Sequence, residues 1–374
     1  MKIGILTLPL VDNYGGILQA FPLRKVLHSK GFDPYLINRR ITPKTQYYYL
    51  LLRAKYFVHR LIGNKRSWVF SEKERLRKEA LQSRYTKRFV DKYITPQTKA
   101  INTTKEFLSL NLFDAYIVGS DQVWRPEYIR YIDVYDYFLD FLQSTDVKRI
   151  SYAASFGTED WTFTKKETEK CRNLIKIFPS VSVREDSAVL MCRNYFDVDA
   201  SHVLDPTMLM SPQEYINSID FSEIDHHKGN MMTYILDNTE EKRDFVNIFA
   251  EKFDLIPFNL SLFNSSGDEN NPTPSVESWI LGFQDANFIL TDSFHGVVFS
   301  ILFNKPFIAI GNEGRGLSRF SSLLKKFQLE NRLIKSIDSS SYNLYNLPIN
   351  WEKVNMILEE ERSKSISFIL NSLK

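Results

Sequence analysis

Residues 288–296, FILTDSFHG, join an apolar run to a polar turn and to the start of a second apolar run. The first run predicts a buried β-strand at Phe288–Leu290, and the second predicts a helix over Val297–Leu302. The turn then lies at the carboxyl end of a strand and at the N-terminus of a helix. Backbone N–H groups at such a helix start favour an anion, so the turn is a candidate ligand site.

His295 is the residue of this turn with the most useful chemistry. Beside a bound phosphate or carboxylate it would be available as a proton donor or acceptor. The alternative is that Asp292 or Ser293 only caps the helix while His295 packs against its neighbours. The remaining histidines lack a comparable setting, and surface or structural roles are expected for them.

Short β-rich runs alternate with helical patterns along most of the chain, which predicts an α/β protein with mainly parallel sheets covered on both faces. Further strands are expected at Ile3–Leu8, Pro34–Ile37, Ala115–Val118, Ile150–Ala153, Val181–Val183, Met232–Leu236 and Pro306–Ile310. Further helices are expected at Lys165–Ile177, Asp186–Asn194, Glu240–Lys252 and Val276–Phe283.

A domain boundary is expected where the strand-like Val203–Leu204 meets Pro206 and a new helix starts near Ser211. The chain then divides into an N-terminal domain at 1–205 and a C-terminal domain at 206–374 that ends in an amphipathic helix. Both are expected to be doubly wound, Rossmann-like domains with a cleft between them. Sheets of this kind bind ligands beyond the carboxyl ends of their strands.

The composition is that of an ordinary soluble globular protein, with 374 residues, 43% of them hydrophobic and 25% charged. Lys and Arg number 48 against 45 Asp and Glu, and a net charge of +3 is too small for a protein whose whole surface binds nucleic acid. The two cysteines, Cys171 and Cys192, form no CxxC or Cys/His spacing, which speaks against disulfides and zinc and favours a reducing cytoplasm. Ligand spacing suggests no metal elsewhere, and no stretch reaches the ~20 apolar residues of a transmembrane helix.

Two further segments carry arginines that can hold an anion. The strand expected before Arg184 places its guanidinium at a strand end, where it can bind a carboxylate or phosphate through two hydrogen bonds. The alternative is an internal ion pair with Glu185 or Asp186. The glycine-rich loop after the last expected strand carries Arg315 and Arg319, which either close over an anionic ligand or remain in solvent.

Two turns of the N-terminal half offer groups that suit a sugar. DNYGGILQ at 12–19 follows the first strand, and its glycines let a ligand approach the backbone closely. GSDQVW at 119–124 presents a carboxylate, an amide and an indole, although Asp121 also fits a turn former and Trp124 a core residue. Pro22 is expected to shorten or kink the helix that follows the first turn, unless that helix starts later.

Taken together and in this order, these pieces resemble the polysaccharide pyruvyl transferase family. The segments that carry the resemblance run from about residue 4 to about residue 325 and are DNYGGILQ, VGSDQVW, ISYAASFG, VSVRED, VLDPTML, TDSFHGVVFSILFNKPFI and RGLSRFSSLL. The resemblance implies a two-domain enzyme of the GT-B type that transfers a pyruvyl group from phosphoenolpyruvate to two hydroxyls of one sugar, forming a cyclic ketal. Phosphoenolpyruvate is then a co-substrate, and no further cofactor is expected.

The resemblance also implies roles for individual residues. His295 would be the general acid and base, Arg184 would bind the donor, and the backbone around Ser293 and Phe294 would hold the anion. The residues expected to contact the acceptor are Asn13, Tyr14, Gly15 and Asp121.

Position 293 departs from the family pattern. Many members carry an arginine there, two positions before the histidine, where it helps to hold phosphoenolpyruvate, whereas this chain has Ser293. The donor still carries a carboxylate and a phosphate, so another cation is required. Arg315 and Arg319 are the candidates, with Lys305 behind them.

Two other functions are compatible with the same architecture. A nucleotide-sugar glycosyltransferase would share the GT-B fold, and an inactive glycan-binding protein would keep only the acceptor contacts. The presence of both His295 and the Arg184 turn disfavours the inactive protein. The expected acceptor is a glycan or lipid-linked saccharide of surface polysaccharide biosynthesis, such as capsule or exopolysaccharide.

Residues 44–90 form a basic segment that the resemblance does not explain, with 13 Lys or Arg against three acids between Lys44 and Arg88. As a helical insertion it would present interleaved apolar residues to the headgroup boundary and basic ones to anionic lipid. This interpretation predicts a cytoplasmic enzyme that is peripheral at the inner face of the membrane. The alternative is a helical insertion that packs on the first domain. No nucleic-acid recognition motif accompanies the charge.

Overall fold

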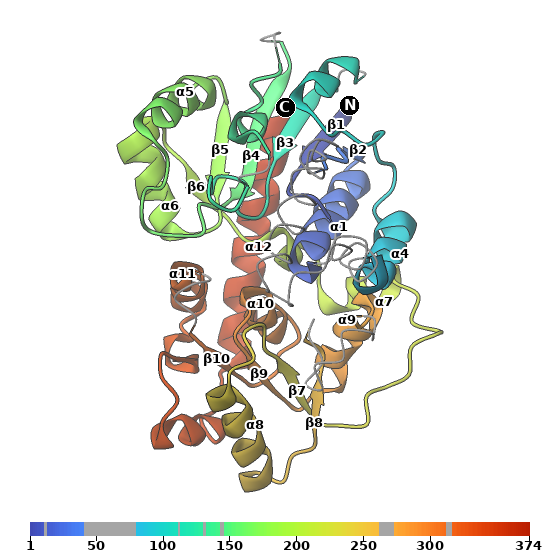
Figure 1. The fold of residues 1–374 in the computed structure, drawn as a ribbon, viewed down its shortest axis with the longest axis vertical. Coiled ribbons are helices and arrows are strands. Elements are labelled where there is room, and N and C mark those ends of the chain that lie inside the picture. Colours follow the sequence, from blue (N-terminus) through green and yellow to red (C-terminus); the bar gives the residue numbers. More distant parts are fainter. Residues whose placement is uncertain are drawn as a thin grey trace, which may run out of the picture.

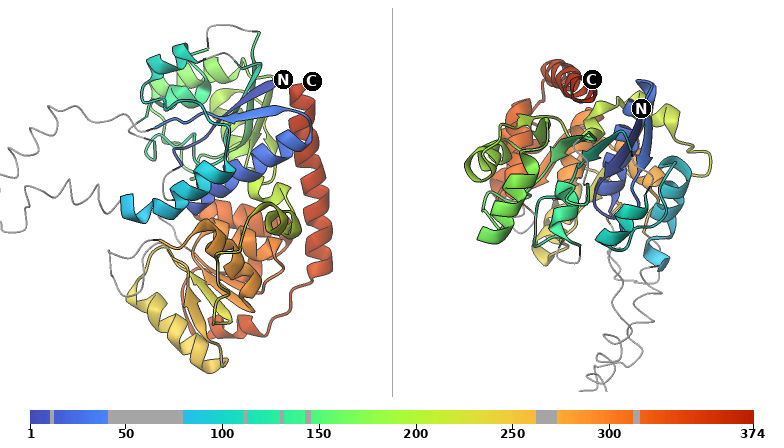
Figure 2. Two further views of the ribbon diagram at one scale, coloured as in Figure 1. Left: turned by 90° about the vertical axis from the view of Figure 1, so that its right-hand side faces the viewer. Right: turned by 90° about the horizontal axis from the view of Figure 1, so that it is seen from above.

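Two α/β domains, each built on a parallel sheet, lie one above the other in Figure 1. Helices cover the faces of both sheets, as the further views in Figure 2 show. The predicted fold class, two doubly wound domains, is confirmed. The computed structural model describes residues 1–10, 13–40, 80–110, 113–129, 132–142, 146–261, 273–311 and 316–374.

In the described part of the chain, the N-terminal sheet has six parallel strands in the order β2-β1-β3-β4-β5-β6. Because β2 and β3 lie on opposite sides of β1, the winding of the chain reverses between β1 and β3. The strands are β1 (Lys2–Leu6), β2 (Asp33–Leu36), β3 (Ala115–Val118), β4 (Lys148–Ala154), β5 (Ser180–Val183) and β6 (Ser201–His202). The helices are α1 (Tyr14–Ser29), α4 (Arg84–Tyr93), α5 (Lys165–Ile175) and α6 (Asp186–Met191), with shorter helical turns at Thr104–Ser109, Val134–Phe138 and Cys192–Phe196.

The C-terminal sheet has the order β11-β10-β9-β7-β8, again parallel, and its winding reverses between β7 and β9. The strands are β7 (Met231–Tyr234), β8 (Pro257–Asn259), β9 (Phe288–Thr291), β10 (Phe307–Ile310) and β11 (Leu333–Ile334). The helices are α7 (Pro212–Ser218), α8 (Glu240–Lys252), α9 (Val276–Asp285), α10 (Phe294–Leu302), α11 (Leu317–Phe327) and α12 (Trp351–Leu373), with short turns at Pro206–Leu209, Glu330–Arg332 and Ser339–Tyr345.

Pro22 does not shorten helix α1, so that part of the sequence prediction is wrong. The helix continues through Pro22 to Ser29. An interior proline costs a helix about 3 kcal/mol, because it removes one backbone hydrogen bond and crowds the preceding turn. Leu18 and Phe21 are fully buried on this helix, and their tertiary packing offsets that cost.

Helix α12 connects the two domains from the C-terminal end of the chain and runs along both in Figure 2. In the chain it comes after the strands of the second sheet, within the residues that the sequence assigned to the C-terminal domain. Its Arg362 donates from Nε to the carbonyl of Met208 at 2.7 Å, and Ser365 accepts from the N–H of Leu204 at 3.0 Å. Its last turn is buried with the first strand, since Leu373 belongs to the same apolar cluster as residues of β1.

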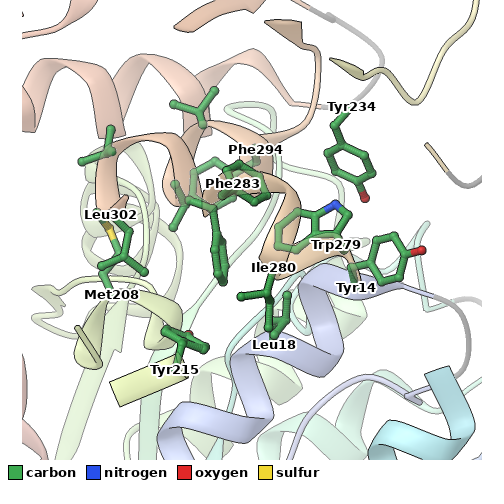
Figure 3. Close-up of a cluster of buried hydrophobic side chains, with 14 of the residues drawn as sticks. Tyr14, Leu18, Met208, Tyr215, Tyr234, Trp279, Ile280, Phe283, Phe294 and Leu302 are labelled. Atoms are coloured by element: carbon green, nitrogen blue, oxygen red, sulfur yellow. The ribbon is translucent and has the colours of Figure 1, made fainter. Parts of the chain in front are cut away.

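An apolar core fills much of the space between the domains, and Figure 3 shows part of it. Tyr14 of α1 packs against Trp279 and Tyr234 of the C-terminal domain, with ring centroids 5.6 and 6.1 Å away. Trp279 also packs edge-on against Phe299 of α10, at 4.8 Å. Buried aromatic side chains therefore hold helix α1 against α9, and α9 against α10.

Most of the basic segment predicted at 44–90, namely 44–79, lies outside the described residues. Its last part leads into α4, where Phe89 is buried against Phe21 of α1, with ring centroids 5.7 Å apart. This part therefore packs on the first domain. No helix in the described ranges is long and apolar enough to cross a membrane.

Candidate active site

Polar turns that follow the strands of both sheets meet between the domains. Each sheet reverses its winding once, between β1 and β3 and between β7 and β9, and such switch points leave a crevice at the carboxyl ends of the strands. The turns after β1, β3, β5 and β9 contribute Gly15, Asp121, Arg184 and His295 to one buried cluster. We call these four residues, with Gln19 and Asp205, the His295 cluster.

His295 is the second residue of α10 and is 8% exposed. Its Nε2 lies 2.8 Å from Nε2 of Gln19 and 3.6 Å from Oδ2 of Asp205. Gln19 comes from α1 and Asp205 from the segment after β6, whereas His295 belongs to the C-terminal sheet. The imidazole therefore joins the two domains.

Ser293 caps the N-terminus of α10, because its Oγ accepts from the N–H of Gly296 at 3.4 Å. Asp292 has a different role, because its carboxylate accepts from the N–H of Leu236 and from Nζ of Lys242, each at 2.6 Å. It ties the end of β9 to the end of β7 and to α8. The cap and the contacts of His295 coexist, so the two interpretations of this turn do not exclude each other.

The first turn of α1 touches the imidazole directly. A Cβ on Gly15 would overlap Nδ1 and Cε1 of His295, so only glycine allows this approach. Asn13 caps the same turn by accepting from the N–H of Gly15 at 3.0 Å. A Cβ on Gly16, in contrast, would meet Oδ2 of Asp121 at 3.5 Å, an ordinary contact distance.

Four donor groups surround the carboxylate of Asp205, which is 2% exposed. Its Oδ1 accepts from the N–H and hydroxyl of Thr207, at 3.0 and 2.7 Å, and its Oδ2 accepts from Arg184 and Gln19, each at 2.8 Å. A carboxyl group that only accepts hydrogen bonds is stabilised in its ionised form. Burial opposes ionisation, but the hydrogen bond and charge of His295, when that ring is protonated, and those of Arg184 outweigh it and hold the pKa of Asp205 well below its usual value.

Arg184 is held among carboxylates. Its Nη1 donates to Asp205 at 2.8 Å, while its Nη2 lies 3.6 Å from Asp121 and its Nε 4.0 Å from Glu185. Burial alone would lower the pKa of the guanidinium, but these three carboxylates raise it above its usual value. An ion pair therefore exists, with Asp205 as its closest partner. Nε and Nη2 of Arg184 have no hydrogen-bond acceptor among the described residues.

A second buried arginine lies beside the first. The guanidinium carbons of Arg184 and Arg319 lie 4.8 and 5.4 Å from the centroid of the Phe294 ring, as in cation–π pairs. Arg319 is the third residue of α11 and is 7% exposed. Burial, and then the positive charge of Arg184, lower the pKa of Arg319 to about 10. An anion between the two guanidiniums would relieve this repulsion.

The other cations considered for the donor are elsewhere. Arg315 lies outside the described residues. Lys305 follows the far end of α10, where its Nζ donates to the carbonyl of Gln284 at 2.9 Å. Of the proposed replacements for the arginine missing at Ser293, the structure thus brings Arg319 to the His295 cluster.

The residues expected to contact an acceptor lie in different surroundings. Gly15 and Asp121 belong to the His295 cluster, and Asn13 caps the turn beside it. Tyr14 is fully buried in the apolar core and donates its hydroxyl to the carbonyl of Pro274, so it has no surface for an acceptor. Trp124 is likewise a core residue, fully buried and stacked on an aromatic neighbour.

Comparison with known proteins identifies the family. The sequence model of the polysaccharide pyruvyl transferase family matches residues 13–314, most of the chain. The chain belongs to this family. No curated protein matches the sequence.

Solved structures with similar folds are GT-B enzymes. UDP-GlcNAc 2-epimerase from Neisseria meningitidis bound to UDP-GlcNAc aligns over 100% of this chain and 99% of its own, with a TM-score of 0.52 and 11% identity. S. aureus MnaA bound to UDP aligns over 96% of this chain and 90% of its own, with a TM-score of 0.48 and 14% identity. The wall teichoic acid polymerase TagF aligns over 98% of this chain and 84% of its own, with a TM-score of 0.46 and 11% identity. The match to the Neisseria enzyme shows that this pyruvyl transferase family member has the GT-B fold.

From the sequence alone we did not expect two residues of the cluster, Gln19 and Asp205, to belong to the site. Both lie in segments that carry the family resemblance. Gln19 follows Gly15 by four positions, so the two share one face of α1, and this periodicity was a usable signal. Asp205 follows an expected strand, as Arg184 does, and that position was a second signal.

Among the described ranges, no group of three or more His, Cys, Asp and Glu side chains is arranged to hold a metal ion. A cavity of about 170 Å³ is lined by Arg88, Lys92, Asp220, Glu223, Ile224 and Glu277, none of which belongs to the cluster.

Proposed function

We propose that this protein transfers a pyruvyl group from phosphoenolpyruvate to two hydroxyls of one sugar and forms a cyclic ketal. The observation that carries the proposal is the gathering of His295 with two buried guanidiniums, Arg184 and Arg319, between the switch points of the two sheets. The membership of the family supports it.

Phosphoenolpyruvate carries a carboxylate and a phosphate on neighbouring atoms. The two nitrogens of Arg184 without acceptors, the guanidinium of Arg319 and the N-terminus of α10 are the groups proposed to bind these anions. Arg184 is 5% exposed and His295 8%, so entry of the donor requires the surrounding loops or domains to move.

The chemistry requires proton transfer at a fixed place. Protonation of C3 of the donor creates a cation-like centre at C2, which a sugar hydroxyl attacks. The bond from C2 to the phosphate oxygen then breaks, and the second hydroxyl closes the ring on C2. The two hydroxyl protons are balanced by the new C3–H bond and by the hydrogen phosphate that leaves. His295 is the proposed general acid and base, a role typically worth about 10²- to 10⁴-fold in rate.

The proposed acceptor is a saccharide, in free or lipid-linked form, that approaches from Asp121 and the turn after β1. The basic segment at 44–90 is proposed to bring the enzyme to an anionic membrane surface, each charge contributing about 1 kcal/mol. Co-sedimentation with vesicles containing anionic lipid, followed by release in salt, tests this part separately. Equal sedimentation with neutral vesicles contradicts it.

The reaction is tested by incubating candidate lipid-linked saccharides with the enzyme and phosphoenolpyruvate and measuring their mass. A gain of one pyruvyl group, with release of phosphate, is expected. Transfer of a sugar from a nucleotide sugar instead would identify a glycosyltransferase, and binding of glycan without any transfer would identify an inactive binding protein.

Two variants test the proposed roles. His295→Ala should lower turnover by about 100-fold or more with little change in folding. His227→Ala, which removes another partly buried histidine of the same domain, is the matched control and should leave turnover unchanged. Near-wild-type turnover of His295→Ala would remove this residue from the mechanism.

Arg184→Ala should mainly weaken phosphoenolpyruvate binding, by about 1.5 to 3 kcal/mol for a lost charged hydrogen bond. Calorimetry measures this directly. Unchanged donor affinity would leave Arg184 as a structural partner of Asp205 alone.

A further inference from the structure

The amide of Gln19 is placed between two groups of the His295 cluster. It is 1% exposed, and its Nε2 lies 2.8 Å from Oδ2 of Asp205 and 2.8 Å from Nε2 of His295. Its other polar atom, Oε1, is buried without a hydrogen-bond partner in the described part of the chain. One atom of this side chain thus has two partners and the other has none.

The contacts of Asp205 decide which way the amide faces. All of them come from donors, because Thr207 donates twice to Oδ1 and Arg184 donates to Oδ2. An ionised carboxylate can only accept, so the Gln19 group next to it must be the NH₂. The second hydrogen of this NH₂ then points to Nε2 of His295, which must accept it with a lone pair.

We propose that Gln19 is a positioning residue that holds neutral His295 as the Nδ1–H tautomer and leaves Nδ1 as the nitrogen that serves the ligand. A neutral imidazole has one proton, and a lone pair at Nε2 places that proton at Nδ1. Nδ1 is the ring nitrogen closest to where a Cβ on Gly15 would stand, at the start of α1.

The NH₂ of Gln19 cannot turn away while Asp205 is ionised. Rotation of the amide would place Oε1 beside Oδ2 of Asp205, where two acceptors repel each other. The carboxylate therefore fixes the orientation of the amide, and with it the hydrogen bond to Nε2 of His295.

The catalytic meaning of this inference rests on the proposed function, but the tautomer itself does not. It is measurable in ligand-free protein with ¹⁵N-labelled histidine, from long-range ¹⁵N–¹H correlations at about pH 8.5, where an ordinary imidazole is neutral. The His295 signals are identified by their absence from the His295→Gln spectrum. The wild-type protein should show the Nδ1–H pattern.

Gln19→Met removes the NH₂ and should convert His295 to the Nε2–H pattern, because Asp205 then becomes the nearest acceptor for that nitrogen. Gln19→Asn, whose shorter amide cannot reach both partners, is the second variant and should give the same change. Gln97→Met is the matched control, since the amide of Gln97 donates to Val90. It should leave the tautomer unaltered.

Turnover provides the functional measurement. Both Gln19 variants should lower kcat by about 10- to 1000-fold and leave the KM for the donor nearly unchanged. The loss is expected to be smaller than the ~10⁴-fold seen in serine proteases when the histidine of the Ser-His-Asp triad is left in the wrong tautomer. An Nε2–H pattern in the wild type, or an unaltered tautomer in Gln19→Met, overturns the inference. Absence of pyruvyl transfer by the wild type would overturn the proposed function while leaving the tautomer result intact.

Discussion

Tyr14 and Gly15 are neighbours at the start of α1, yet they belong to opposite kinds of environment. Tyr14 is buried among Trp279 and Tyr234, where the two domains share an apolar core. Gly15 lies against the imidazole of His295, in a cluster of buried charges. One helical turn therefore contributes both to the apolar and to the charged part of the domain interface.

The difference teaches how buried charges are kept in place. Ion pairs such as Arg184 with Asp205 are weak evidence for stability, because desolvation of both charges offsets their attraction. Burial of aromatic side chains is strongly favourable. The apolar part therefore supplies most of the interaction between α1 and the C-terminal domain, and this packing holds the charged part in a fixed geometry.

The largest effect on stability is expected from a change in the apolar part of the domain interface. Trp279→Ala removes a fully buried side chain and should lower the free energy of unfolding by about 3–5 kcal/mol. Urea unfolding followed by circular dichroism measures this loss. His295→Ala is the comparison and should change stability by less than about 1 kcal/mol. Similar losses in the two variants would contradict the division of roles.

Gly15→Ala tests the boundary between the two parts. The new Cβ would overlap the imidazole and displace His295, and a misplacement of about 1 Å at a reacting group can cost about 100-fold in turnover. Gly16→Ala is the matched control, because its Cβ has room beside Asp121. Steady-state kinetics should show the loss in the first variant and little change in the second. Full activity of Gly15→Ala would contradict the close approach.

Arg319→Ala tests the charged part of the domain interface alone. Loss of this guanidinium should weaken phosphoenolpyruvate binding about 10-fold or more, the range of a lost charged hydrogen bond. Lys325→Ala, on the exposed side of the same helix, is the control, because its side chain is 73% exposed. Calorimetric titration compares the two. Equal donor affinity in both variants would mean that Arg319 does not replace the arginine missing at Ser293.

The smallest expected effect concerns pH and His202, whose Nε2 lies 3.0 Å from the carbonyl oxygen of Arg184. Burial, and then the charge of Lys326, lower the pKa of His202 to about 4. Because the unfolded chain takes up this proton at higher pH than the folded one, stability is present above about pH 6.5 and is lost as pH falls toward 4.

His202→Asn should reduce this pH dependence by an amount on the order of 1–2 kcal/mol between about pH 7 and about pH 5. Thermal unfolding across that range checks it against the wild type. Parallel curves for the two proteins would show that His202 titrates as an ordinary exposed histidine.

Local patterns predicted the elements of the fold closely. The helix expected at Glu240–Lys252 has these bounds, and the helix expected at Val297–Leu302 begins earlier, at Phe294. That earlier start brings His295 into the first turn. The strand-to-helix turns at Arg184 and His295 were also found from sequence, because apolar runs followed by polar residues reflect local burial and capping.

The sequence by itself determined the alternation of strands and helices, the two parallel sheets and the turns at their carboxyl ends, because these depend on residues close together in the chain. Only the tertiary structure decided which of those turns meet. Gln19 and His295 are 276 positions apart, and their contact depends on how two sheets pack through a shared apolar core. For the same reason Tyr14 lies in that core and Asp205 joins Arg184 to Gln19. No local pattern encodes such distances, since they are set by the packing of whole domains.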